Sequence, residues 1–253
     1  MKLIYAYDLP TRIFHWSFAI LFASAFFIAK VIDDDSLLFS YHMLSGLMMV
    51  VLVLLRIFWG FVGSKTARWN SWKLSPKELT SYFKEILTAK TARYLGHNPA
   101  SSYAAILMFL FTFGLGLSGT MMSLDINKHF FEEMHELMGN GFIVTVIAHI
   151  VGVLFHQFKH RDGMILSMIT GKKQDIEGQV GITSQHKGVG VFLIGLLVVM
   201  GLYFNHQFDQ ASRSLNLLGV QLQLGENEHE HHHSGENKGH SINFGNEHED
   251  DDD

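Results

Sequence analysis

Four histidines of this chain lie where their imidazole rings could bind a metal or a cofactor. His135 and His149 belong to the largely apolar stretch MHELMGNGFIVTVIAHI, and His15 and His42 belong to IFHWSFA and YHMLSG. A polar ring buried in an apolar span is costly unless something binds it. Imidazole is a common metal ligand and an axial ligand of haem iron. We therefore expect a metal or redox function.

The spacing of His135 and His149 places the two rings on one helix face at two depths. They are fourteen residues apart, which at 100° per residue leaves them within about 40° of each other. The helical rise separates them by roughly 21 Å along the axis. Such a helix presents one ligand near each side of a membrane.

The histidines lie in or beside long apolar segments. Of the 253 residues, 48% are hydrophobic and 17% are charged, with a net charge of −5. The apolar residues are gathered into five segments, which are Ile13–Ala29, Leu44–Val62, Tyr103–Met122, Phe142–Phe158 and Val189–Phe204. Each approaches the length of about 20 residues that crosses a bilayer, and none has the polar stripe of a soluble helix. The fold class is therefore an all-α integral membrane protein, a four-helix transmembrane bundle with a probable fifth C-terminal helix. The first segment is longer than the apolar core of a signal peptide, so we expect it to be retained.

Basic residues set the expected orientation. Lys and Arg are concentrated in the N-terminal arm, in residues 63–98 and in residues 159–187, whereas the other connections are mainly acidic. Cytoplasmic loops carry the excess of Lys and Arg. We therefore expect a multi-pass protein of the bacterial inner membrane with a cytoplasmic N-terminus.

Alternating helix direction then pairs the histidines. His42 and His135 fall at the outer level, and His15 and His149 fall toward the inner level. Two histidine pairs at two depths are what two bis-histidine haems require, with the four rings as axial ligands of haem iron. The chain has no cysteine, so any haem is held noncovalently. His156 competes with His149 as the inner ligand, although its basic surroundings are typical of a solvated histidine.

Small residues and one arginine share the faces of these histidines. Gly46 follows His42 by four residues, and Gly139 follows His135 by four. Positions three and four apart share a helix face, so each glycine leaves clearance for a flat macrocycle; Ala19 and Gly152 do the same beside the inner pair. Arg56 follows His42 by fourteen residues. It could pair with a haem propionate or reach the cytoplasmic interface, and these readings stay open.

The segments DLPTRIFHW, HMLSG, LLRIFWGFVGS, GHNP and HELMG with AHIVGVLFH resemble the bacterial cytochrome b561 family, which is similar to the cytochrome b subunits of nickel–iron hydrogenases. The resemblance covers residues 1 to about 173. It implies a four-helix membrane bundle with two haem b groups ligated by His15, His42, His135 and His149. It also implies electron transfer between the quinone pool and a redox partner.

Three functional hypotheses follow. The leading one is an electron-transfer cytochrome b subunit, not a self-contained enzyme, that exchanges electrons with quinone or quinol and with a periplasmic cytochrome c or oxidoreductase subunit, and has no nucleic-acid partner. The second is a quinone-linked oxidase of a small molecule such as superoxide at the outer haem. The third is a metal-handling protein that uses the His-rich tail, where His229 and His231–His233 could bind nickel, copper or zinc.

The expected domain organisation follows the composition. Residues 1–173 form the di-haem cytochrome b domain, and residues 174–204 form a linker and the fifth transmembrane helix. Residues 205–253 are acidic and His-rich with almost no apolar periodicity, so we expect a disordered tail.

Overall fold

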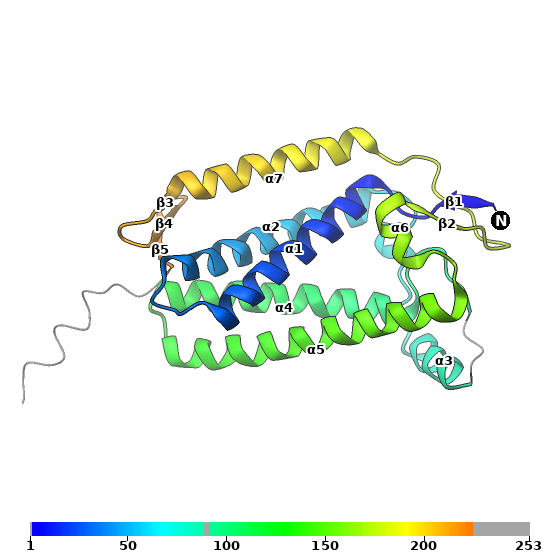
Figure 1. The fold of residues 1–253 in the computed structure, drawn as a ribbon, viewed down its shortest axis with the longest axis horizontal. Helices are drawn as coiled ribbons and strands as arrows, with labels where there is room; N and C mark the ends of the chain where they lie inside the picture. Colours follow the sequence, from blue (N-terminus) through cyan, green and yellow to red (C-terminus); the bar gives the residue numbers. More distant parts are fainter. Residues whose placement is uncertain (1, 89–91, 225–253) are drawn as a thin grey trace, which may run out of the picture.

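The protein is a bundle of long helices lying side by side (Figure 1). The structure, a computed structural model, describes residues 2–88 and 92–224. Within these ranges five helices are long and apolar enough to cross a membrane. They are α1 (Leu9–Val31), α2 (Ser40–Val62), α4 (Pro99–Ser123), α5 (Lys128–His160) and α7 (Lys187–Gln207). They match the five apolar segments, which confirms the expected helical membrane bundle.

Shorter elements lie at the two ends of the bundle. The helices among them are η1 (Leu37–Phe39), η2 (Trp69–Ser71), α3 (Pro76–Leu87) and α6 (Met164–Thr170), and the strands are β1 (Leu3–Tyr5), β2 (Lys172–Gln174), β3 (Phe208–Asp209), β4 (Ser214–Leu217) and β5 (Val220–Gln223). Figure 1 shows α3, α6, β1 and β2 at the end that carries the N-terminus, here called the N-terminal end, and β3 to β5 at the opposite end.

The long helices alternate in direction and pack as two hairpins. α1 packs along α2, and α4 packs along α5, while α2 and α4 join the two pairs. α7 packs mainly on α1. α5 makes little backbone contact with α1 or α2, so the space between these helices is left to side chains and to whatever binds there.

Side-chain caps fix where three helices begin. The carboxylate of Asp8 accepts a hydrogen bond from the Thr11 amide at 2.9 Å, and the amide oxygen of Asn98 accepts one from the Ser101 amide at 2.8 Å. Ser75 caps α3 in the same way through the amide of Glu78. Each cap satisfies a backbone donor that a helix start leaves without a partner. Ser75 and Asn98 are each followed by a proline at the first helical position, a local helix-start signal that the sequence carries.

Aromatic and aliphatic side chains fill the middle of the bundle. Phe142 of α5 is 1% exposed, and its ring lies 4.7 Å from that of Phe22 and 6.1 Å from that of Phe18. Large apolar side chains such as Phe58 and Phe192 point outward from the long helices. This arrangement suits a bundle surrounded by lipid.

The N-terminal arm is tied to the segment that follows α6. β1 pairs antiparallel with β2, with Ile4 opposite Lys173. Periodicity did not predict this two-stranded sheet. The expected domain boundary at residue 173 falls inside β2, so residue 174 continues the same unit.

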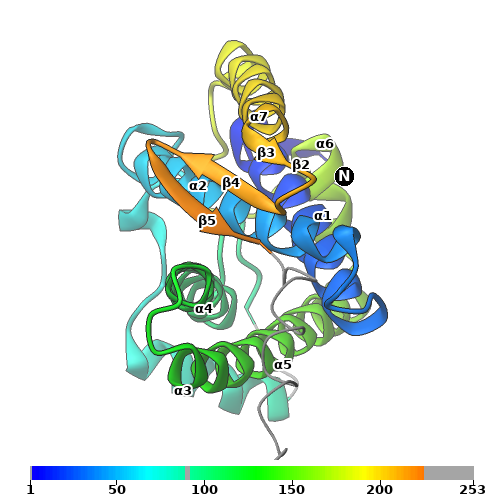
Figure 2. The same cartoon turned by 90° about the vertical axis from the view of Figure 1, so that its left-hand side faces the viewer.

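The prediction of disorder from residue 205 is wrong for the described part of that tail. β3, β4 and β5 form an antiparallel sheet, which lies across the opposite end of the bundle in Figure 2. Leu215 and Leu222 are at most 3% exposed and pack in a cluster with Leu44 and Met48 of α2. Alternation over a few residues buries one face of such short strands, a signal that the acidic composition obscured. The histidines at 229 and 231–233 lie outside the described residues.

Candidate functional site

The rings of His42 and His135 face each other at the opposite end of the bundle. Their centroids are 6.0 Å apart at an interplanar angle of 63°. His42 belongs to the first turn of α2, and His135 lies two turns into α5. The pairing expected from helix direction therefore brings these two rings together.

Hydrogen bonds orient both rings through the same nitrogen atom. Nδ1 of His42 lies 2.9 Å from the carbonyl oxygen of Ala25, which can only accept, so this nitrogen carries the proton. Nδ1 of His135 lies 2.9 Å from Oγ of Ser118, whose own hydroxyl donates to the carbonyl of Gly114. Ser118 therefore accepts from His135. In a neutral imidazole, a proton on Nδ1 leaves the lone pair on Nε2, which is the form that binds a metal.

The space beside these rings is open where the sequence places glycine. A Cβ atom on Gly46 or on Gly139 would meet no heavy atom within 4 Å. At Gly119, by contrast, a Cβ would contact Cε1 of His135 at 3.6 Å. Sequence reasoning missed Gly119 and Ser118, because both lie on α4, which carries no histidine.

His15 and His149 form the second pair, nearer the N-terminal end. They are close enough to interact electrostatically, as the alternating helices predicted. Nδ1 of His15 is buried and has no hydrogen-bond partner within residues 2–88 and 92–224, and its ring meets that of Trp16 edge-on at 5.3 Å. A Cβ on Gly152 would meet nothing within 4 Å. This level thus resembles the first in having an open helix face beside a histidine.

His156 is placed differently from the solvated histidine that its basic surroundings suggested. Its ring is buried, with Nε2 3.3 Å from a carboxylate oxygen of Asp162. Its ring centroid lies 4.4 Å from that of His160, at an interplanar angle of 44°. The ring therefore belongs to a polar cluster at the C-terminal end of α5, and its Nε2 already contacts Asp162.

The Arg56 side chain is buried beneath the loop that follows α2. It is 3% exposed, and its Nη2 donates to the carbonyl of Ala67 at 2.9 Å. The guanidinium lies over the rings of Trp69 and Trp72 at 5.7 and 5.5 Å. Its Nη1 has no hydrogen-bond partner among the described residues. The guanidinium is therefore shielded from solvent and keeps a donor available for a further partner.

His97 joins this group from the loop before α4. Its ring is 4.9 Å from that of Trp72 and meets Tyr7 edge-on at 6.1 Å. Burial, and after it the positive charge of Arg56, lowers the pKa of His97 from 6.5 to about 3. The imidazole is therefore neutral at physiological pH.

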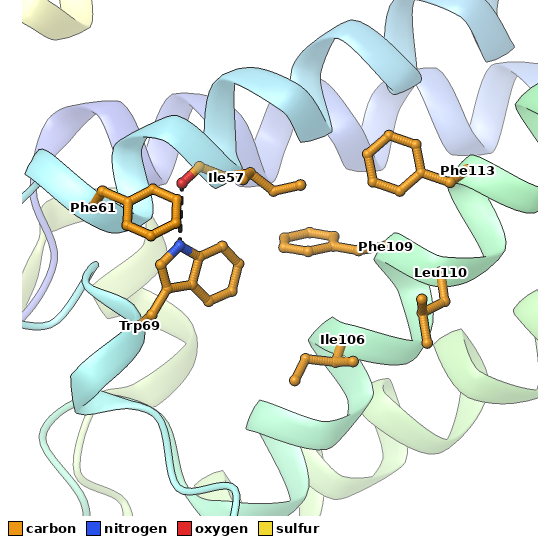
Figure 3. Close-up of a pocket in the computed structure, with 7 residues that line it drawn as sticks. All are labelled: Ile57, Phe61, Trp69, Ile106, Phe109, Leu110 and Phe113. Carbon is orange, nitrogen blue, oxygen red and sulfur yellow. Dashed lines mark hydrogen bonds between the residues drawn. The ribbon is translucent and has the colours of Figure 1, made fainter.

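An apolar groove of about 360 Å³ opens between α2 and α4 near the same level (Figure 3). It is lined by Ile57, Phe61, Trp69, Ile106, Phe109, Leu110 and Phe113. Figure 3 shows the indole of Trp69 at one side, where its nitrogen donates to the carbonyl of Ile57 at 3.2 Å. The lining contains no charged side chain and suits a hydrocarbon chain or an aromatic ring.

The residues of the His42–His135 pair fit a haem group. Two metal–imidazole bonds of about 2 Å would hold ring centroids roughly 6 Å apart, which agrees with the His42–His135 separation of 6.0 Å. The proton on Nδ1 leaves Nε2 available, and the unpartnered Nδ1 of His15 shows that the inner level has unsatisfied polar groups. The arrangement can hold a redox cofactor without any cysteine.

Comparison with known proteins agrees with this geometry. The sequence profile of the prokaryotic cytochrome b561 family matches residues 6–171. A probable Ni/Fe-hydrogenase B-type cytochrome subunit of Rhizobium leguminosarum bv. viciae is 27% identical over 213 residues, covering 67% of this chain and 88% of the relative. The protein of the same name from Rhodobacter capsulatus is 26% identical over 216 residues, covering 67% and 81%.

A shorter match extends to a probable Ni/Fe-hydrogenase 1 B-type cytochrome subunit of Escherichia coli (strain K12). It is 27% identical over 138 residues, covering 46% of this chain and 58% of the relative. No solved structure matches the chain at a significant level. The family profile spans α1 to α6, with both histidine pairs, and stops before α7 and the β3–β5 sheet. This chain therefore belongs to the prokaryotic cytochrome b561 family, as a b-type cytochrome that crosses a bacterial membrane several times and transfers electrons.

Proposed function

We propose that this protein carries electrons across the bacterial inner membrane through two haem b groups, between the quinone pool and a redox partner on the periplasmic side. His42 and His135 would hold the outer haem, and His15 and His149 would hold the inner haem. The haem iron supplies a one-electron redox centre at each level.

The observation that carries this proposal is the geometry of the outer pair. The two rings are 6.0 Å apart, and both Nδ1 atoms are held by hydrogen bonds that leave Nε2 free. Such partners fix the tautomer and the orientation of a ligating imidazole. Because residues 46 and 139 are glycines, the helix surface beside each ring leaves space for a flat macrocycle.

The distribution of charge supports the orientation. Basic residues are concentrated at the N-terminal end of the bundle, in residues 63–98 and 159–187, and positively charged connections stay cytoplasmic. The connections at the opposite end carry Asp33–Asp35, Glu132 and Glu133. The inner haem therefore faces the cytoplasm. An acidic outer end also disfavours attraction of a small anion such as superoxide.

The groove of Figure 3 supports quinone exchange near the inner haem. It is apolar and open on the side that lipid would cover. Phe109 on its wall is 5.9 Å from Phe14, which is adjacent to His15 in the sequence. An isoprenoid quinone dissolved in the bilayer would reach this level without crossing a polar surface. Depending on the direction of electron flow, quinol donates the electrons or quinone accepts them.

The names of the relatives support a particular class of partner. They are called B-type cytochrome subunits of Ni/Fe-hydrogenase, so we propose that a periplasmic oxidoreductase subunit, of hydrogenase type, docks at the His42–His135 end. A periplasmic cytochrome c would meet the same surface. In either case the protein acts as an electron-transfer subunit of a larger assembly.

A reduced-minus-oxidised spectrum with a haem-to-protein ratio tests the proposal. We expect a b-type spectrum and two haems per chain. His42→Ala and His135→Ala should remove the same spectral component, and His15→Ala and His149→Ala should remove the other. A ratio of one, or loss of the same component in His42 and His15 variants, would refute the two-haem arrangement.

A further inference from the structure

Four buried nitrogen atoms that have no hydrogen-bond partner in the described part of the chain come together beside the His15–His149 level. They are Nδ1 of His15, Nη1 of Arg56, Nε1 of Trp72 and Nδ1 of His97, from four separate segments of the chain. The Arg56 guanidinium is 5.5 Å from the Trp72 ring, and the Trp72 ring is 4.9 Å from the His97 ring. His97 in turn interacts electrostatically with Arg56 and His15. Each unpaired buried polar atom lowers stability, so this grouping points to a ligand that pairs with them.

The charge of this group selects an anion. Arg56 forms no ion pair with any carboxylate among the described residues. Asp8 is near enough to interact with it electrostatically, but its Oδ1 accepts from the Thr11 amide, and its Oδ2 accepts from the Trp59 indole and the Ser64 amide. Nη2 of Arg56 is committed to the carbonyl of Ala67. Nη1 of Arg56 and the Trp72 indole are donors only, so they require an acceptor, and the buried positive charge of Arg56 favours one that carries negative charge.

We propose that Arg56, Trp72 and His97 form a carboxylate pocket that receives a propionate of the inner haem. This inference rests on the proposed function, because it needs a haem between His15 and His149. Nη1 of Arg56 can donate a charge-assisted hydrogen bond to a propionate oxygen, and the Trp72 indole adds a second donor. Nδ1 of His97 donates to the same propionate, and the His97 ring lines the side of the pocket nearest α4.

Removal of an indole donor tests the pocket, and a second Trp→Phe variant controls for the smaller ring that the substitution leaves. Trp72→Phe deletes the unpaired Nε1 donor, whereas Trp69→Phe is the matched control, because the Trp69 indole already donates to Ile57. Both variants are purified with their haems, and the propionate bending vibration of each haem is recorded by resonance Raman spectroscopy. We expect this band to shift for the inner haem of Trp72→Phe and to stay at the wild-type position in Trp69→Phe.

Charge removal gives a second measurement on the same pocket. Arg56→Met should lower the midpoint potential of the inner haem, because loss of a nearby positive charge favours the oxidised iron. Arg56→Lys should restore much of that potential without restoring the wild-type Raman band, since an ammonium lacks the planar fork. The outer haem should be unchanged in both variants, and it serves as the internal reference.

The outcomes separate this inference from the function on which it rests. A wild-type protein with fewer than two haems refutes the proposed function itself. Two haems with unshifted propionate bands in Trp72→Phe and an unchanged inner potential in Arg56→Met overturn the pocket. If those bands are unshifted while the KM for quinol rises in Trp72→Phe, the donors bind quinone, and the propionate assignment is wrong. Should Arg56→Met fail to accumulate, the Trp72→Phe comparison decides alone.

Discussion

Asp162 and Lys173 form an ion pair in which neither side chain is exposed to solvent. Nζ of Lys173 lies 3.2 Å from Oδ2 of Asp162 and donates to the carbonyl of Tyr94 at 2.5 Å. His156 shares the same carboxylate oxygen at 3.3 Å, and Arg93 lies 3.9 Å from it. This cluster joins the end of α5, the strand β2 and the loop before α4.

We predict that Asp162→Asn strongly destabilises the protein. The substitution leaves Lys173 buried without its counter-ion, and removal of one partner from a buried pair costs about 3 to 5 kcal/mol. Thermal unfolding in detergent should show a large drop in Tm. Asp175→Asn is the matched control, because its pair with Lys2 is exposed at 3.9 Å and such pairs contribute at most about 1 kcal/mol. An equal drop in both variants would contradict the prediction.

The stabilisation from Asp162 should depend on pH. Burial alone raises the pKa of this carboxyl, but the His156 hydrogen bond and the Lys173 charge outweigh it and lower the pKa from 3.8 to about 2. A lowered carboxyl pKa gives stability that is present above the unfolded value and lost as the pH falls through the folded value. The Tm difference between wild type and Asp162→Asn should therefore be large at pH 6 and shrink between about pH 4 and pH 2. A constant difference over that range would exclude an ionised Asp162.

We predict that Ser118→Ala affects only the outer haem. The hydroxyl accepts from Nδ1 of His135, and loss of a partner that orients a ligand typically weakens binding by roughly 10–100-fold. Haem occupancy during dilution into haem-free detergent should fall for the outer spectral component. Ser123→Ala is the control, because Ser123 bonds to the Thr120 carbonyl of its own helix. Equal loss of both haems would argue against this pairing.

We predict that His156→Ala keeps both haems, whereas His149→Ala loses one. The Nε2 of His156 already contacts Asp162. His149, by contrast, lies one turn before Gly152, where an added Cβ would meet no heavy atom within 4 Å and a cofactor therefore has room. The haem-to-protein ratio of each purified variant gives the answer. His156→Ala should still lower Tm, since it removes one partner of the buried carboxylate. Loss of a haem in His156→Ala alone would move the inner ligand to that position.

We predict that the sheet β3–β5 stabilises the bundle and that the sequence beyond it does not. A chain that stops after Leu224 should melt like the full-length protein and keep both haems. A chain that stops after Gln207 loses the buried side chains of Phe208, Leu215, Leu222 and Leu224, each contributing about 1.5 to 3 kcal/mol when fully buried. It should melt lower while retaining all four proposed haem ligands. Equal melting of the two truncated chains would mean that the sheet contributes nothing.

The long helices could be predicted because a bilayer imposes one strong requirement on the sequence. Five apolar segments became α1, α2, α4, α5 and α7, and their alternation alone placed His42 opposite His135. Helix-start signals at Ser75 and Asn98 were local and therefore readable. These features depend on residues within a few turns of each other or on direction across the membrane.

The features that were missed depend on contacts between distant segments. Ser118 bonds to His135 from another helix, and Lys173 lies buried within a run that reads as a solvated basic loop. Trp72 and His97 approach Arg56 only after the loops at the N-terminal end have folded. The periodicity of a single segment does not predict which donors from different segments will lie close together. The histidine pairs could therefore be predicted from the sequence, but only part of their surroundings could.

The fourteen-residue separation of His135 and His149 on α5 has an electrical consequence. Their levels differ by roughly 21 Å, about two thirds of a hydrocarbon core of ~30 Å. An electron moving between the proposed haems therefore crosses most of the membrane's electric field, which changes its free energy by about 1.5 kcal/mol per 100 mV. The voltage across the membrane then shifts the equilibrium between the two sites, and electron transfer in one direction works against a field that assists it in the other.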